Sequence, residues 1–271
     1  MSIKEKELPD KTSRQPDLVT LLLGDHDVDI QKDSRSRVFG SFDDLFKFLP
    51  QLRVLDLSRT DITCLPTSVS CLVNLNYLNI SHTDISSLPL ELNKLRNLRQ
   101  LNLRNTPHLT DIPYRAICSF KKNLKTLNLY CSSYKWSHKK GEMQIRLESL
   151  LTFKLQELGI NMKVVQDLAV LLRSPLRRSV TFLSLDEMSS LAKDSLELSF
   201  SSMSNLQQVY ISSCSTLTEL TFPCEKLQAL QVLFLKGLPL SRIATQPASA
   251  NHFLPCLHRL HISQCHQLEE F

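Results

Sequence analysis

Glycine is scarce in this sequence: its 271 residues include five glycines, scattered at positions 24, 40, 141, 159 and 237. A glycine-rich phosphate loop needs clustered glycines, because only a backbone without side chains can close around a phosphate. The sequence therefore excludes such loops. A nucleophile elbow of the form G-x-S-x-G is also absent. We identify no catalytic and no cofactor-binding residue, and we predict that the chain is not an enzyme.

Long apolar runs are also missing, and none approaches the roughly 20 residues that a transmembrane helix needs. The opening segment MSIKEKELPDK has no apolar stretch after its charges, so it does not resemble a secretory signal. The eight cysteines are irregularly spaced and include no C-x-x-C pair. This favours reduced thiols over a disulfide framework, and we predict a cytoplasmic location.

What the sequence does contain is a repeat. The pattern L-x-x-L-x-L begins at Leu52, Leu75 and Leu98, in steps of 23 residues. Less regular copies begin at Leu18, Leu124, Leu155, Val180, Leu206, Leu230 and Leu257. The last two leucines of each copy alternate as in a strand and point inward, so stacked copies bury a continuous core. The pattern predicts an α/β leucine-rich-repeat solenoid over residues 1–271, with about eleven repeats. We expect a horseshoe with a parallel β-sheet on its concave face and irregular loops and short helices on its convex face.

The second halves of the three regular copies agree as well, in a T-x-I-x-x-L-P-like segment from Thr60, Thr83 and Thr106. The prolines at its end, at positions 66, 89 and 113, favour a non-helical return because proline lacks an N–H and fixes φ. The three threonines follow the strands. We expect their side chains, and the thiols of Cys214 and Cys265, to bond the turn backbone of a neighbouring repeat.

The array divides into three parts: regular repeats over 1–130, a protruding loop and return over 131–154 that holds the single Trp, and irregular repeats over 155–271. Apolar residues at helical spacing predict short helices over 42–49 and 164–172.

Residues that point outward from the strands form the expected concave binding surface. Aromatic and arginine side chains are the usual anchors of such surfaces. The candidate protein-binding residues are Tyr77, Arg104, Tyr130, Tyr210, Phe234 and Arg259.

Positive charge is concentrated between positions 91 and 146, where 12 Lys and Arg face 3 Asp and Glu. We interpret this segment as a docking patch for an acidic domain. Its residues are Arg96, Arg99, Lys121, Lys122 and Lys125, with Arg104 beside them. A solvated surface without a partner is an alternative. Nucleic-acid binding is less favoured, because aromatic residues are not interleaved with these cations.

A cluster of cysteines and histidines near the end of the sequence could suggest zinc. Cys265 is expected in the turn while His261 points out of the strand, so the two cannot easily converge. We predict no metal site.

The segment LRVLDLSRTDITCLPTSVSCLVNLNYLNISHTDISSLP (52–89) resembles the leucine-rich-repeat region of plant intracellular coiled-coil nucleotide-binding disease-resistance receptors. LVTLLL (18–23), LQQVYISSCSTLTEL (206–220) and LHRLHISQCHQLEEF (257–271) are similar to the same region, although His-Gln stands where that family commonly has Pro-Lys. The resemblance spans essentially the whole chain.

This resemblance implies an effector-recognition and autoinhibitory module that acts in the defense response. Its partners would be a pathogen effector or a guarded host protein, and the nucleotide-binding domain of a parent receptor. That receptor could associate peripherally with a membrane. The chain has no coiled coil and no P-loop, so nucleotide binding is not carried over. Its ends fall inside repeats, as in a fragment. The alternative is a free-standing leucine-rich-repeat scaffold or substrate-adaptor protein, although no F-box is visible.

Overall fold

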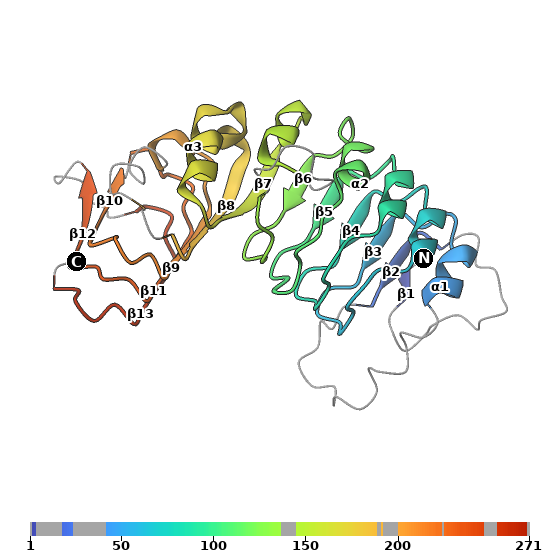
Figure 1. Cartoon of the computed structure of the whole chain (residues 1–271), viewed down its shortest axis with the longest axis horizontal. Coiled ribbons are helices and arrows are strands. Elements are labelled where there is room, and N and C mark those ends of the chain that lie inside the picture. The colour runs from blue at the N-terminus through green and yellow to red at the C-terminus, as the bar shows by residue number, and fades with distance from the viewer. Residues whose placement is uncertain are drawn as a thin grey trace. The chain divides into compact units, whose positions relative to one another are not determined.

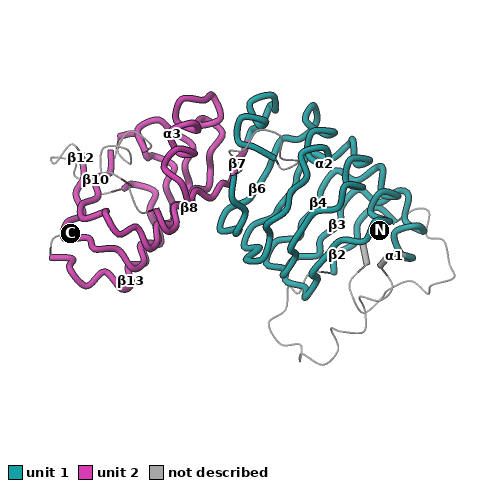
Figure 2. Tube along the Cα trace, in the orientation of Figure 1, with its two compact units in different colours: residues 1–156 teal, residues 157–271 magenta. Residues whose placement is uncertain are grey.

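The computed structural model describes residues 2–3, 18–23, 42–136, 145–188, 191, 200–223, 225–246 and 254–269. The chain divides into two compact units, Met1–Gln156 and Glu157–Phe271 (Figure 2). Each unit is a stack of short parallel strands whose connections run through irregular segments and short helices (Figure 1). This arrangement is the predicted leucine-rich-repeat fold. The number of repeats stays a prediction, because several of the expected copies fall partly outside the described residues.

The strands of unit 1 pair in parallel in chain order. They are β1 (Ser2–Ile3), β2 (Thr20–Leu22), β3 (Val54–Asp56), β4 (Tyr77–Asn79), β5 (Gln100–Asn102) and β6 (Thr126–Asn128). The register aligns equivalent positions of successive copies, so Leu55 pairs with Leu78 and Leu78 with Leu101. All three leucines are fully buried, as the alternation predicts. The core of unit 1 is therefore a ladder of the motif's own leucines.

The return segments of unit 1 contain short helices, so the expectation of a non-helical return is wrong. The helices are α1 (Phe42–Leu45), η4 (Phe46–Phe48), η5 (Thr67–Cys71), η6 (Leu90–Lys94), α2 (Tyr114–Cys118) and η7 (Leu147–Thr152). Pro66, Pro89 and Pro113 come directly before η5, η6 and α2, and the carbonyl of each accepts the first helical hydrogen bond. A proline fits this place because the first N–H groups of a helix have no helical partner. The helix expected over 42–49 is present as α1 and η4.

The strands β3 to β6 each end in a tight turn with one residue in the left-handed region. In unit 1 these residues are Arg59, His82, Asn105 and Cys131, with φ between 51° and 58°. The threonines that follow donate to a carbonyl three residues earlier in their own repeat, such as Thr83 Oγ1 to Ile80 O at 2.7 Å. Our expectation that they bond a neighbouring repeat is therefore wrong. The threonine closes its own turn instead.

The strands of unit 2 are longer. They are β7 (Glu157–Met162), β8 (Val180–Asp186), β9 (Gln208–Ser212), β11 (Val232–Lys236) and β13 (Arg259–Ser263), each pairing with the next in parallel. A second parallel pair, β10 (Glu219–Pro223) and β12 (Arg242–Gln246), lies in the return segments. The return after β7 holds α3 (Val165–Arg173), at the position of the expected helix, and η8 (Pro175–Ser179).

The start of the expected protruding loop packs into unit 1 instead. Tyr134 and Trp136 are only 1% and 5% exposed, and their rings meet edge to face with centroids 5.3 Å apart. The Tyr134 hydroxyl donates to the Ile145 carbonyl at 2.6 Å. The prediction of a protruding loop is wrong for these two side chains, and residues 137–144 lie outside the described part of the chain. No helix in the described ranges combines the length and the apolar character that crossing a membrane requires.

Candidate functional site

The outward face of the unit 1 strands is dominated by a buried polar ladder. Asp56, Asn79, Asn102 and Asn128 occupy equivalent strand positions, and each side chain accepts the backbone N–H two residues later. Asn79 also donates from Nδ2 to Asp56 Oδ2 at 2.9 Å, which joins two repeats. These side chains hold the turns after the strands, and the oxygen that accepts in each is already engaged there.

The predicted binding residues of unit 1 are less accessible than the sequence suggests. Tyr130 is only 3% exposed, so almost none of its side chain is accessible to a partner in this structure. The guanidinium of Arg104 lies 5.0 Å from its ring centroid, in a cation–π contact. Tyr77 is half-buried, and burial together with the negative charge of Asp56 raises the pKa of its hydroxyl. Arg104 and Tyr77 therefore present only part of their side chains to solvent.

The outward face of unit 2 carries a row of aromatic rings. Tyr210 on β9, Phe234 on β11 and His261 on β13 are paired across the sheet by the strand register. The ring centroids are 6.4 Å apart between Tyr210 and Phe234, and 5.5 Å apart between Phe234 and His261. Tyr210 and Phe234 are half-buried and His261 is exposed. We call these three side chains the aromatic row.

Two exposed cations flank the aromatic row. Arg259 begins β13 and pairs in register with Val232, while Lys236 ends β11 and pairs with Ser263. Among the described residues, neither cation has a carboxylate within ion-pair distance. The row thus runs across the strands, with Arg259 on one side of it and Lys236 on the other along the strand direction. It brings together three predicted residues, Tyr210, Phe234 and Arg259.

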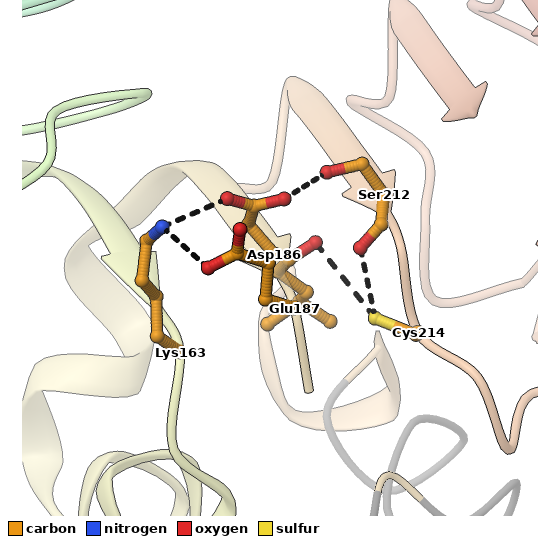
Figure 3. Close-up of polar contacts among 6 residues, drawn as sticks. Lys163, Asp186, Glu187, Ser212 and Cys214 are labelled. Carbon is orange, nitrogen blue, oxygen red and sulfur yellow. Dashed lines mark hydrogen bonds and ion pairs between the residues drawn. The ribbon is translucent and has the colours of Figure 1, made fainter. Parts of the chain in front are cut away.

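A polar cluster lies at the end of β8, the strand that pairs with β9 (Figure 3). Lys163 Nζ lies 3.0 Å from Asp186 Oδ2 and 3.1 Å from Glu187 Oε2, and Ser212 donates to the other oxygen of Asp186. Burial lowers the pKa of Lys163, but its two carboxylate partners raise it by more, so the net shift is upward. Lys163 therefore compensates one of the two negative charges of this cluster within unit 2.

Cys214 lies beside the same cluster and is fully buried. Its thiol is 3.2 Å from the Ser212 carbonyl, and 4.0 Å from the Leu185 carbonyl of the preceding repeat. The expected contact with a neighbouring repeat is therefore present for this cysteine. Burial raises the pKa of the thiol to about 11, so it stays protonated and unreactive at neutral pH. Cys265 contacts its own repeat at Ser263 instead.

The five predicted docking cations gather at one edge of unit 1, before β5 and β6. Two hydrogen bonds join the two repeats there, a backbone bond from Lys125 N to Arg99 O at 2.7 Å and a side-chain bond from Asn123 Nδ2 to Arg96 O at 2.8 Å. We call this set the basic edge: Arg96, Arg99, Lys121, Lys122 and Lys125. In the described part of the chain none of the five pairs with a carboxylate. Arg104 is not part of it, because it lies beyond the other end of β5.

A second ladder of asparagines was not predicted from the sequence. Asn74, Asn97 and Asn123 each stand immediately before the first leucine of a copy and donate to a carbonyl of the preceding repeat, at 2.8 to 3.1 Å. In unit 2, Asn205 donates likewise to the Arg178 carbonyl at 2.7 Å. The recurring N-L pair is the sequence signal that identifies this ladder.

Within the described ranges no three His, Cys, Asp or Glu side chains are arranged to hold a metal ion. Cys256 is exposed, and Cys265 is directed to the backbone of its own turn. The cysteine–histidine cluster near the end of the sequence therefore has no converging ligands among the residues described.

Repeating parallel strands with buried leucines and short returns define a leucine-rich-repeat protein. The family model for a leucine-rich repeat region matches residues 38–270, and the chain belongs to this family. Repeats of this kind form protein-interaction modules. No curated protein matches the sequence.

Two solved structures are similar to this chain. An internalin from Listeria monocytogenes shares 17% identity, with a TM-score of 0.46 over 94% of this chain and 66% of that chain. A leucine-rich-repeat protein from Leptospira interrogans shares 16% identity, with a TM-score of 0.31 over 84% of this chain and 86% of that chain.

Proposed function

We propose that this chain recognises a protein partner through the outward face of unit 2, with the aromatic row as its centre. The supporting observation is that three contacting rings remain half-buried or exposed between two unpaired cations. Aromatic and arginine side chains at the centre of an interface contribute most of its binding energy. Because half-buried rings are already restricted by their neighbours, they lose little further rotamer freedom when a partner covers them. The described strands β3 to β6 of unit 1 carry the polar ladder at the equivalent outward position instead of a row of rings.

The test compares partners captured from extracts of the source organism by the wild-type chain and by a Tyr210→Ser, Phe234→Ser variant, using quantitative mass spectrometry. Val73→Ser is the matched control, because Val73 is a 47% exposed apolar residue of unit 1. We expect the wild type and the control to retain proteins that the row variant loses. Circular dichroism must show that all three fold alike. Identical captured sets would contradict recognition by the row.

We propose further that this module belongs to a plant intracellular immune receptor, where it recognises a pathogen effector or a guarded host protein in the cytoplasm. The support is the sequence resemblance of residues 52–89, 206–220 and 257–271, quoted above. The basic edge then has a role as the docking patch for an acidic nucleotide-binding domain, which would hold the receptor inactive. Its unpaired cations across two neighbouring repeats favour that role.

The receptor proposal is tested by sequencing the transcripts that contain this reading frame. An upstream P-loop domain in the same frame supports it, and transcripts without one favour a free-standing scaffold or adaptor. Where that domain exists, its binding to the chain should weaken with salt and with Arg99→Glu, Lys122→Glu and Lys125→Glu combined. Lys226→Glu, an exposed cation of unit 2, is the control. Equal binding by the triple variant would contradict docking at the basic edge.

A further inference from the structure

The charges around the aromatic row indicate what kind of partner it fits. The outward positions of β9, β11 and β13 carry three rings and two cations and no carboxylate. The nearest outward acid, Asp186 on β8, is occupied by Lys163 and by Ser212. Among the described residues no carboxylate lies within ion-pair distance of Arg259 or Lys236, so both cations are available to acidic groups of a partner.

The spacing of the two cations is set by the strands. Arg259 is in register with Val232, and Lys236 lies four residues further along β11. With a rise of about 3.3 Å per residue, their backbone positions are about 13 Å apart along the strand direction. Phe234 and its register partner His261 lie midway between them. The order along the surface is therefore cation, aromatic pair, cation.

We propose that this surface binds an extended segment of a partner protein with an acidic residue at position i, an aromatic or large apolar residue at i+2 and a second acidic residue at i+4. Side chains at i, i+2 and i+4 of an extended chain point to the same side, and they span about 13 Å. They match the positions of Arg259, the ring pair and Lys236 in either chain direction. This inference rests on the proposed recognition function and specifies its ligand.

Three alternatives fit the surface less well. In a helix, residues i and i+4 are only about 6 Å apart along the axis, so a helical ligand would need acids about eight residues apart. A basic segment could stack its cations on the rings, but Arg259 and Lys236 would repel it. Proteins also bind single-stranded nucleic acid with aromatic rings and cations. A groove that follows a phosphate backbone is lined by more than the two cations present here.

The experiment is selection from a phage-displayed library of random peptides of about twelve residues against the folded full chain. Three variants are selected in parallel: Phe234→Ser, the charge reversal Lys236→Glu with Arg259→Glu, and the control Lys226→Glu. We expect the wild type and the control to enrich acid-x-apolar-x-acid. Phe234→Ser should enrich no such motif. The charge reversal should keep the central apolar residue and change its flanks to Lys and Arg.

An enriched peptide is then synthesised with a fluorescent label, and its affinity is measured by polarisation. Replacing either acid by Gln should weaken binding roughly two- to fivefold, the size of an exposed ion pair. Replacing the central residue by Ser should weaken it about tenfold or more, as for an interface anchor. Moving the two acids next to the apolar residue should cost as much as removing them, because they then point to the other face.

The outcomes separate the two proposals. Peptides that depend on Phe234 but carry no acidic bias, or that place the acids at helical spacing, would overturn this inference and leave recognition by the row intact. A selection without any Phe234-dependent peptide would contradict the proposed function and this inference together. If a labelled oligothymidylate binds the wild type and not the Phe234→Ser variant, the ligand of the row is single-stranded nucleic acid and not a peptide, which would overturn this inference.

Discussion

Replacing Asn79 by Ala tests whether the polar ladder of unit 1 holds its repeats together. Asn79 is 7% exposed, accepts the N–H of Ser81 at 3.1 Å, and donates to the Asp56 carboxylate at 2.9 Å. The alanine removes both bonds at once. It leaves the N–H of Ser81, a residue that is only 5% exposed, without its acceptor.

The size of the effect follows from the two bonds. A hydrogen bond to a charged group contributes about 1.5–3 kcal/mol, and a buried N–H left unpaired costs about 1–3 kcal/mol. Because the two contributions share one side chain and the turn can relax, we expect a loss of about 2–4 kcal/mol in the free energy of unfolding. This is a large part of the roughly 5–15 kcal/mol that keeps a typical domain folded.

The assay is urea unfolding at pH 7, followed by far-ultraviolet circular dichroism. With a denaturant slope of about 3 kcal/mol/M, the midpoint should fall by about 1 M. The control is Gln100→Ala on the next strand, because Gln100 is exposed and is the register partner of Tyr77. A second variant, Asn79→Asp, keeps an acceptor for Ser81 but places two carboxylates together. The loss in the free energy of unfolding of Asn79→Asp relative to wild type should become smaller as the pH falls, because the introduced carboxylate is then protonated. A midpoint for Asn79→Ala no lower than that of Gln100→Ala would refute the reasoning.

Three further outcomes are expected. Leu101→Ala should lower the free energy of unfolding by about 2–5 kcal/mol in the same urea assay, because Leu101 is fully buried and the change leaves a cavity. Lys163→Met should cost roughly 0.5–1 kcal/mol, since the pairs with Asp186 and Glu187 are partly exposed. Its partners raise the pKa of Lys163, so this difference from wild type should persist up to about pH 10.4 and disappear as the pH rises through the higher folded value. Cys214, with a pKa of about 11, should resist a thiol reagent at pH 8 until the chain is unfolded, as mass spectrometry of the labelled peptides can show.

The sequence predicts the fold well because the information is local to each copy. Leu98, Leu101 and Leu103 are all fully buried, as their alternation requires. The helix at α1 and η4 follows in the same way from the spacing of its apolar residues, among them the fully buried Phe46. A pattern contained within one repeat can be recognised without knowledge of the neighbouring repeat.

The candidate site is predicted less well, because exposure depends on neighbouring repeats. Tyr130 is outward by periodicity, yet the side chain of Arg104 from the preceding repeat lies over its ring. Trp136 stands in a polar segment, and only tertiary packing explains its burial. His261 joins the aromatic row through a strand register with Phe234, 27 residues earlier in the chain, which a sequence alone does not fix. Tyr210 and Phe234 were predicted as outward residues, but their contact with one another was not.

One strand position explains why the two units present different outward faces. Between the second and third apolar residues of the motif, unit 1 has Asp56 and three asparagines, and its strands β3 to β6 end at that position. Each of these side chains takes the N–H two residues later, so that N–H leaves the strand ladder, although later backbone bonds such as Arg59 N to Ser81 O still join the repeats.

In β8, β9, β11 and β13 the same position holds Ser184, Tyr210, Phe234 and His261, and these strands continue for two more residues. The first strand of unit 2, β7, has Asn161 in register with Ser184 and ends one residue later. A phenyl, phenol or imidazole ring in this position does not accept the backbone N–H two residues later. That N–H therefore stays in the hydrogen-bond ladder between strands, and the ring remains on the outward face of the sheet. Phe234→Asn should therefore do more than remove a ring. It should shorten β11 and release the amide of Lys236 from the ladder, which hydrogen exchange at that residue would detect. Phe234→Leu, which cannot close the turn, should leave that amide protected. Equal exchange in the two variants would show that this position does not set the length of the strand.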